Sequence, residues 1–208
     1  MSAKFIRRIV EVFIAILFLG AFLHIGRAVA ALLDGRFGTL HWPLQAGALD
    51  LEVAVGDGAS AVFVDGVLEV SGLPFWHGID LIFSLAFIAI FVLALLRLRT
   101  VLFNFAEGEV LSTANAAALR KIGLLLFAVF GLSVLHAVLL QTAIISAVET
   151  DANTVLHPAI SWDVKGVTNL WLHYDVPLFT LVFGGVAILF SEAFRAGTAY
   201  REDSESVI

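Results

Sequence analysis

The run LIFSLAFIAIFVLALL, residues 81–96, decides the structural class of this protein. It contains no charged residue, and apolar side chains would occupy every face of the helix that it forms. An amphipathic helix of a soluble protein keeps one polar face, whereas crossing a bilayer core requires about 20 mostly apolar residues. The sequence therefore predicts a membrane-spanning helix over residues 79–98.

Three further stretches have the same character, at residues 9–33, 122–148 and 173–194. The chain of 208 residues is 60% hydrophobic and 14% charged, whereas a soluble domain is about 45–50% apolar and roughly 25% charged. This balance excludes a disordered chain, a nucleic-acid-binding module and an ordinary soluble enzyme, and the absence of cysteine excludes disulfides and thiolate metal sites. We predict an all-α membrane fold, a four-transmembrane-helix bundle forming one membrane domain over residues 1–208.

Basic residues predict the orientation of the spans. Nine flank the spans on one side: Lys4, Arg7, Arg8, Arg97, Arg99, Arg120, Lys121, Arg195 and Arg201. The other side has Arg36 and Lys165, with Arg27 in the outer part of the first span. Because cytoplasmic loops are enriched in lysine and arginine, we expect both termini, the inner loop 99–121 and the tail 195–208 to be cytoplasmic. The predicted location is a bacterial cytoplasmic (inner) membrane, crossed several times, with the first span retained and not cleaved as a signal peptide.

The segment 34–78 is predicted to be a small β-rich extracytoplasmic loop between the first and second spans. The alternation of LDLEVAV predicts a strand at 49–55, and the runs SAVFV and VLEV predict strands at 60–64 and 67–70. Turns at Gly56-Asp57-Gly58 and Asp65-Gly66 separate the three. Tryptophans at positions 42, 76, 162 and 171 lie near the same ends of the spans. Their positions predict an interfacial aromatic belt.

Seven polar residues in or near the spans are candidates for an intramembrane network: His24, Arg27, His77, Asp80, His136, His173 and Asp175. An ionisable group inside a span costs about 2.5–3.5 kcal/mol on insertion scales unless it is paired. We therefore predict that Arg27 bonds the carboxylates of Asp80 and Asp175 as a structural contact. The alternative is a small outer pocket, lined also by His77 and His173, that binds a ligand or a divalent metal.

No cofactor is predicted, but one alternative concerns haem b. His24 and His136 each lie about 21–22 Å along their helices from the inner side, at about 1.5 Å per residue, so they could face each other. Two such histidines are able to ligate a haem iron, and a quinone-binding subunit belongs to the same class of hypothesis. The alternative is that each histidine hydrogen-bonds a neighbouring helix. No phosphate-binding glycine loop or catalytic triad motif occurs, which favours a protein that is not an enzyme.

The inner hairpin, NFAEGEVLSTANAAALRKIG at residues 104–123, contains a helix-breaking Gly108 and a candidate helix cap at Ser112 or Thr113. Together with the tail it predicts a cytoplasmic docking surface, whose candidate residues are Asn115, Arg120, Lys121, Arg195 and Arg201. The alternative is that these residues only cap helices and determine topology.

The hairpin and the tail resemble a bacterial membrane family, the domain-of-unknown-function family numbered 2975. The matching positions are Gly108, Asn115, Leu119, Arg120, Ile122 and Gly123 in the hairpin, and Glu192, Phe194, Arg195, Gly197, Glu202 and Asp203 in the tail. The resemblance implies four spans without an assigned biochemical activity. Some members are encoded beside small helix-turn-helix regulators, which implies a cytoplasmic partner of that kind.

The sequence therefore predicts a regulatory or sensing membrane component surrounded by the lipid bilayer. One alternative is a bis-histidine haem or quinone-binding subunit, and another is a transport subunit that works as a homo-oligomer, since four spans rarely enclose a pathway. Small residues such as Gly184 and Gly185 would permit close helix packing.

Overall fold

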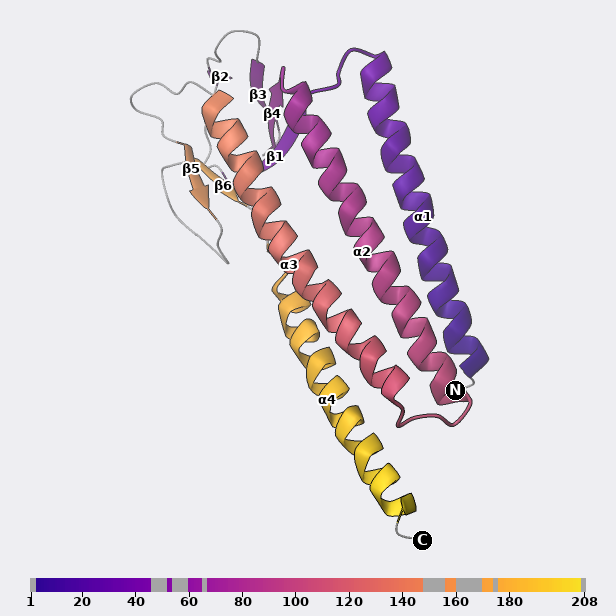
Figure 1. Ribbon diagram of the computed structural model, residues 1–208. Helices are drawn as coiled ribbons and strands as arrows, with labels where there is room; N and C mark the ends of the chain where they lie inside the picture. The colour runs from indigo at the N-terminus through magenta and orange to yellow at the C-terminus, as the bar shows by residue number, and fades with distance from the viewer. Residues whose placement is uncertain are drawn as a thin grey trace. The chain divides into compact units, whose positions relative to one another are not determined.

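The computed structural model describes residues 3–45, 52–53, 60–64, 67–147, 156–159, 170–173 and 176–206. Its long elements are four helices: α1 (Ala3–Leu33), α2 (Pro74–Ala106), α3 (Thr113–Ala147) and α4 (Leu178–Ser206) (Figure 1). Each is long and apolar enough to cross a membrane. The predicted four spans thus correspond to four helices, which indicates a multi-pass membrane protein.

Exposed apolar side chains support the same conclusion. Phe22, Leu33 and Leu189 are 73%, 81% and 71% exposed, and in α1 only 6% of the most apolar 18-residue window is buried. Such surface is unfavourable in water at about 25 cal/mol per Å², but a bilayer removes this cost. The helix is also a form in which every backbone group of a spanning segment is hydrogen-bonded within the segment.

The chain forms two compact units. The first contains Met1–Leu23, Leu85–Gly131 and Pro177–Ile208, and the second contains His24–Ser84 and Leu132–Val176. The first unit therefore holds the start of α1, the later part of α2, the first half of α3 and all of α4. The second holds the other parts of α1, α2 and α3 together with the strands.

Glycines bring α3 and α4 into close contact within the first unit. A Cβ atom added at Gly123 would lie 2.7 Å from the carbonyl oxygen of Gly184 and 2.6 Å from Cγ1 of Ile188. Small residues of this kind let helix backbones approach in membranes. Below the glycines, the buried Ser191 hydroxyl donates to the carbonyl oxygen of Ala116 across 2.7 Å. These contacts fix α4 against α3.

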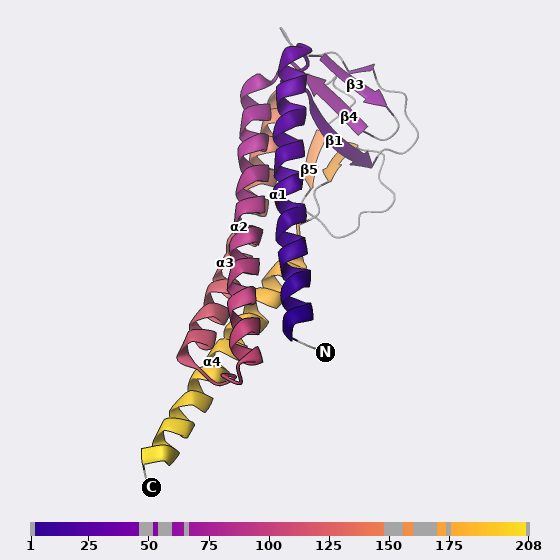
Figure 2. The ribbon, with the colours of Figure 1, turned by 90° about the vertical axis from the view of Figure 1, so that its right-hand side faces the viewer.

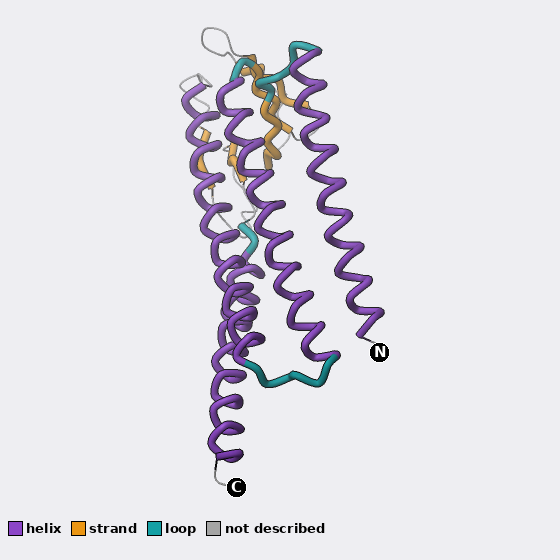
Figure 3. Tube along the Cα trace, turned by 45° about the vertical axis from the view of Figure 1, so that its right-hand side comes forward, coloured by secondary structure: helices purple, strands orange, loops and turns teal. Residues whose placement is uncertain are grey.

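The connection between α2 and α3 is much shorter than the predicted inner loop 99–121, because both helices continue into that range (Figure 3). Only residues 107–112 lie outside the helices. Gly108 has φ +84°, a conformation that favours glycine. The Ser112 hydroxyl oxygen accepts the backbone N–H of Asn115 at 3.2 Å, so the predicted helix cap at Ser112 is confirmed.

The second unit contains a six-stranded sheet of order β2-β3-β4-β1-β6-β5, in which all neighbours are antiparallel except β5 and β6 (Figure 2). The strands are β1 (Leu40–Gln45), β2 (Glu52–Val53), β3 (Ser60–Val64), β4 (Val67–Ser71), β5 (Leu156–Ala159) and β6 (Leu170–His173). The predicted strands at 60–64 and 67–70 are confirmed as the β3–β4 hairpin. Of the predicted strand 49–55 only β2 is described, and the predicted turns at residues 56–58 and 65–66 lie outside the described residues.

Strand β1 was not predicted, and it changes the role of one tryptophan. Trp42 is 4% exposed and pairs with Leu68 of β4, so it is a buried residue of the sheet and not a member of an interfacial belt. The segment LHWPLQ contains Pro43, a feature that argues against a strand in sequence. Trp162 lies outside the described residues, as does the side chain of Trp171.

Candidate functional site

A cavity of about 430 Å³ in the second unit collects most of the predicted intramembrane polar residues. Its described lining comes from α1, from β1 and the residue before it, from the start of α2 and from α3: His24, Arg27, Ala28, Ala31, Thr39, Leu40, His41, Trp42, His77, Asp80, Leu81 and Leu140. The lining therefore mixes polar and aliphatic side chains, and α1 and α2 each contribute both kinds. Ligand pockets typically have this mixed lining and a volume of about 300–1,000 Å³.

Asp80 is held by His136 across the space between α2 and α3. The two atoms, His136 Nε2 and Asp80 Oδ1, are 2.9 Å apart, and the imidazole also lies 4.9 Å from the ring of Phe83. When Asp80 is ionised its carboxylate only accepts hydrogen bonds, and His136 Nε2 is then the donor. His136 is buried, whereas the side chain of Asp80 is 32% exposed and lines the cavity. The structure thus pairs Asp80 with His136, whereas the sequence analysis expected Arg27 as its partner.

His77 joins the start of α2 to the residue that precedes β1. Its Nδ1 donates to the backbone oxygen of Thr39 at 3.0 Å, and its ring lies 4.6 Å from that of Phe37. Because a carbonyl oxygen cannot donate, Nδ1 carries the proton and, in the neutral ring, Nε2 is an acceptor. The His77 side chain thus holds one wall of the cavity in place.

His24 and Arg27 form the part of the cavity wall that α1 provides. They are three residues apart and therefore lie on one face of the helix. His24 Nε2 is buried and has no hydrogen-bond partner. Arg27 makes no hydrogen bond or ion pair with another residue in the described part of the chain. Among the described residues, the His24 Nε2 atom and the Arg27 guanidinium are therefore the polar groups of the cavity wall that have no hydrogen-bond partner.

The remaining members of the predicted network are not assembled by the structure. Asp175 and the side chain of His173 lie outside the described residues, so the predicted Arg27–Asp175 contact stays a prediction. Among the residues that the structure describes, no group of three or more His, Asp or Glu side chains is arranged to hold a metal ion. The His24–His136 haem hypothesis also stays a prediction, with His136 Nε2 already bonded to Asp80.

We expect Asp80→Ala to lower the free energy of unfolding by about 1–2 kcal/mol, because it leaves the His136 N–H without its acceptor. Unfolding by SDS titration from mixed micelles measures this quantity. The control is Asp34→Ala, which removes an exposed carboxylate that does not line this cavity. Equal stability of the two variants would contradict a structural role for the Asp80–His136 bond.

At the other candidate region, in the first unit, Asn115 organises the α2–α3 turn. Its amide Nδ2 donates to the backbone oxygens of Glu109 and Val110 at 2.7 and 3.0 Å, and its Oδ1 accepts from Asn104 Nδ2 at 2.7 Å. Asn115 is completely buried. It therefore acts inside the turn and presents no side-chain surface to a partner, unlike the docking role proposed for it from sequence.

Beside this turn lies a groove of about 480 Å³, which we call the turn–tail groove. It is lined by Glu107, Gly108, Glu109, Leu111, Ser112 and Thr113 of the turn, and by Thr198, Arg201 and Glu202 of α4. The tail is held there because Gly197 lets the helix approach Leu111, whose Cδ2 would be 3.2 Å from an added Cβ. Three carboxylates against one guanidinium make the groove acidic.

The other predicted docking residues lie around this region without forming one cluster. Arg120 and Lys121 are exposed on α3, and Arg195 pairs with Glu192 at 2.6 Å on the surface of α4. Of the five, only Arg201 lines the groove. Glu107, Glu109 and Glu202 were not predicted as groove residues, although Glu107 and Glu109 flank Gly108 and Glu202 lies in the acidic tail.

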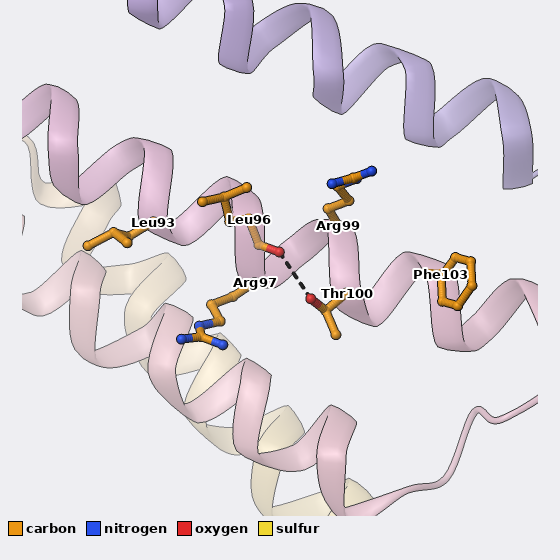
Figure 4. A pocket seen from close by; sticks show the side chains of 6 residues that line it. All are labelled: Leu93, Leu96, Arg97, Arg99, Thr100 and Phe103. Atoms are coloured by element: carbon orange, nitrogen blue, oxygen red, sulfur yellow. Dashed lines mark hydrogen bonds between the residues drawn. The ribbon is translucent and has the colours of Figure 1, made fainter.

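A third concavity, of about 430 Å³, lies along α2 (Figure 4). Arg97 and Arg99 project from α2 in different directions, and the Thr100 hydroxyl donates to the backbone oxygen of Leu96 in the same helix. Arg99 is bound to Glu11 of α1 at 3.0 Å. The lining combines two arginines with the apolar side chains of Leu93, Leu96 and Phe103. Such a combination is expected where a spanning helix meets lipid phosphates.

Comparison with protein-family models, curated proteins and solved structures finds no match to this chain. The resemblance to the domain-of-unknown-function family numbered 2975 therefore stays a prediction.

Proposed function

We propose that this chain is a regulatory or sensing component of a bacterial cytoplasmic membrane, and that a soluble cytoplasmic partner docks in the turn–tail groove. The observation that carries the proposal is the groove itself, an acidic concavity built by the α2–α3 turn and the charged end of α4. The partner segment that fits it is basic, by charge complementarity. The family resemblance suggests a helix-turn-helix regulator as that partner.

The distribution of basic residues supports a cytoplasmic position for the groove. Nine of the twelve lysines and arginines belong to the first unit, and the second unit has only Arg27, Arg36 and Lys165. The groove also belongs to the first unit. By the positive-inside tendency, the end of the protein that carries the groove faces the cytoplasm.

The rigidity of the groove also supports docking. Asn115 fixes the turn by its hydrogen bonds, and the rings of Phe105 and Phe194 stack at 5.8 Å between α2 and α4. A surface that is already ordered loses little conformational entropy when a partner binds. The haem or quinone subunit and the oligomeric transport subunit remain alternative predictions, since no observation favours either over docking.

The absence of cysteine makes the orientation directly testable. A membrane-impermeant maleimide applied to intact cells is expected to label Asp34→Cys and to leave Tyr200→Cys unlabelled until the cells are lysed. Both positions are exposed, so accessibility within the fold does not distinguish them. Labelling of Tyr200→Cys in intact cells would reverse the orientation and overturn the proposal.

Docking is tested by a photo-crosslinking amino acid at Glu202 or, as a matched control, at Tyr200. Both residues lie near the end of α4, but Tyr200 is 77% exposed and does not line the groove. We expect an adduct with one soluble protein from Glu202, a much weaker one from Tyr200, and loss of the Glu202 adduct in the background of Glu109→Lys. Equal adducts at both positions, or insensitivity to Glu109→Lys, would reject docking in the groove.

A further inference from the structure

We propose that the cavity of the second unit binds a small organic carboxylate with an apolar body, and that Arg27 is its anchoring residue. This inference does not rest on the docking proposal, because the cavity and the turn–tail groove belong to different units. The hydrogen-bond partners of the polar groups in the cavity wall show which of them are available to a ligand.

Most of the polar wall groups already have partners. Asp80 is bonded to His136, His77 is bonded to the Thr39 carbonyl, and His41 lies 3.2 Å from a carboxylate oxygen of Glu69. These contacts hold the wall in place. The carboxylate of Asp80 is stabilised in part by its hydrogen bond to His136. The paired groups therefore do not select a ligand by themselves.

Arg27 is different, because its charge is permanent and no described residue pairs with it. A guanidinium in a span is costly unless an acceptor meets it, and a carboxylate matches its planar fork with two parallel hydrogen bonds. One helical turn away, His24 has a buried nitrogen without a partner. His24 also lines the cavity, so its imidazole belongs to the wall that a bound ligand would meet.

The rest of the wall specifies the remainder of the ligand. Ala28, Ala31, Leu81 and Leu140 provide an aliphatic surface, and Trp42 adds a buried indole. A ligand made only of charged groups would leave this surface without contacts, whereas an aromatic or aliphatic acid covers it. The volume of about 430 Å³ accommodates such a molecule.

The test uses 2-naphthoate as the probe and 2-naphthamide as its neutral counterpart of the same shape. Isothermal titration of the full-length protein in detergent is expected to show saturable naphthoate binding, with naphthamide at least tenfold weaker because it lacks the charge. Titration of empty micelles corrects for partitioning. No saturable binding of naphthoate, or equal binding of the two probes, would overturn the proposal.

Variants then locate the site. Arg27→Gln is expected to weaken naphthoate binding at least tenfold, and His24→Leu several-fold. Arg36→Gln removes the same charge from an exposed position of the second unit that does not line the cavity, and it is expected to bind like the unmodified chain. Equal losses in Arg27→Gln and Arg36→Gln would show only a general charge effect and would reject the site.

Lipid nanodiscs distinguish the two natural sources of such an acid. If oleate within a phosphatidylcholine bilayer displaces bound naphthoate, the site takes a membrane fatty acid, and if it does not, the site takes a soluble acid. Both results support a carboxylate site. The carboxylate site would be contradicted if Arg27→Gln bound naphthoate with unchanged affinity and naphthoate raised the unfolding temperature of this variant as much as that of the unmodified chain.

Discussion

Asn115→Ala is expected to lower the free energy of unfolding by about 2–4 kcal/mol. The substitution removes three side-chain hydrogen bonds and leaves the carbonyls of Glu109 and Val110 and the amide of Asn104 without partners. Because Asn115 is fully buried, water does not replace those bonds without opening the turn. SDS titration or thermal unfolding in detergent measures the loss.

Two further variants identify the cause. Asn115→Asp keeps the shape but directs a carboxylate oxygen at two carbonyls, so it is expected to be at least as destabilising as alanine. Asn104→Ala removes only one of the bonds and is expected to cost about 1 kcal/mol. If Asn115→Asp proved as stable as the unmodified chain, the hydrogen bonds would not be what holds the turn.

The second large effect is expected from Gly123→Ala, with a loss of about 1–3 kcal/mol. The new Cβ would lie 2.7 Å from the backbone oxygen of Gly184, and a backbone atom moves only if α4 moves with it. Ile188 is also too close, at 2.6 Å. Helix propensity would favour alanine over glycine, so a net loss isolates the packing contribution.

Gly131→Ala is the matched control, because Gly131 lies on the same helix with no heavy atom within 4 Å of an added Cβ. It is expected to leave stability unchanged or to raise it by up to about 1 kcal/mol. Thermal unfolding of both variants in the same detergent compares them. If Gly131→Ala lost as much stability as Gly123→Ala, the close approach of α3 and α4 would not explain the destabilisation.

The four spans and the β3–β4 hairpin were predictable because each depends on a local pattern. The length of an apolar run is a local property, and so are two short β-prone runs separated by the turn signal Asp65-Gly66. The Ser112 cap was predictable for the same reason, since it acts over three residues. The lengths of α2 and α3 were underestimated, because charged residues end an apolar run without ending a helix.

The cavity could be predicted only in part. His24, Arg27, His77 and Asp80 were identified because ionisable groups are rare in spans, and all four line it. Their partners were not predictable, since His136 and Asp80 are 56 residues apart and pairing depends on which helix faces meet. Trp42 was assigned to an interface because a strand containing proline is difficult to recognise.

By itself, the sequence determined that most of this chain forms apolar helices, because transfer from water to hydrocarbon is a property of composition and length. Only the tertiary structure decided that Asn115 is a buried bridge within the turn, that Gly123 meets Gly184, and that Asp80 pairs with His136. The physical reason is range: hydrogen bonds and close packing act over about 3–4 Å, so they depend on which distant segments become neighbours.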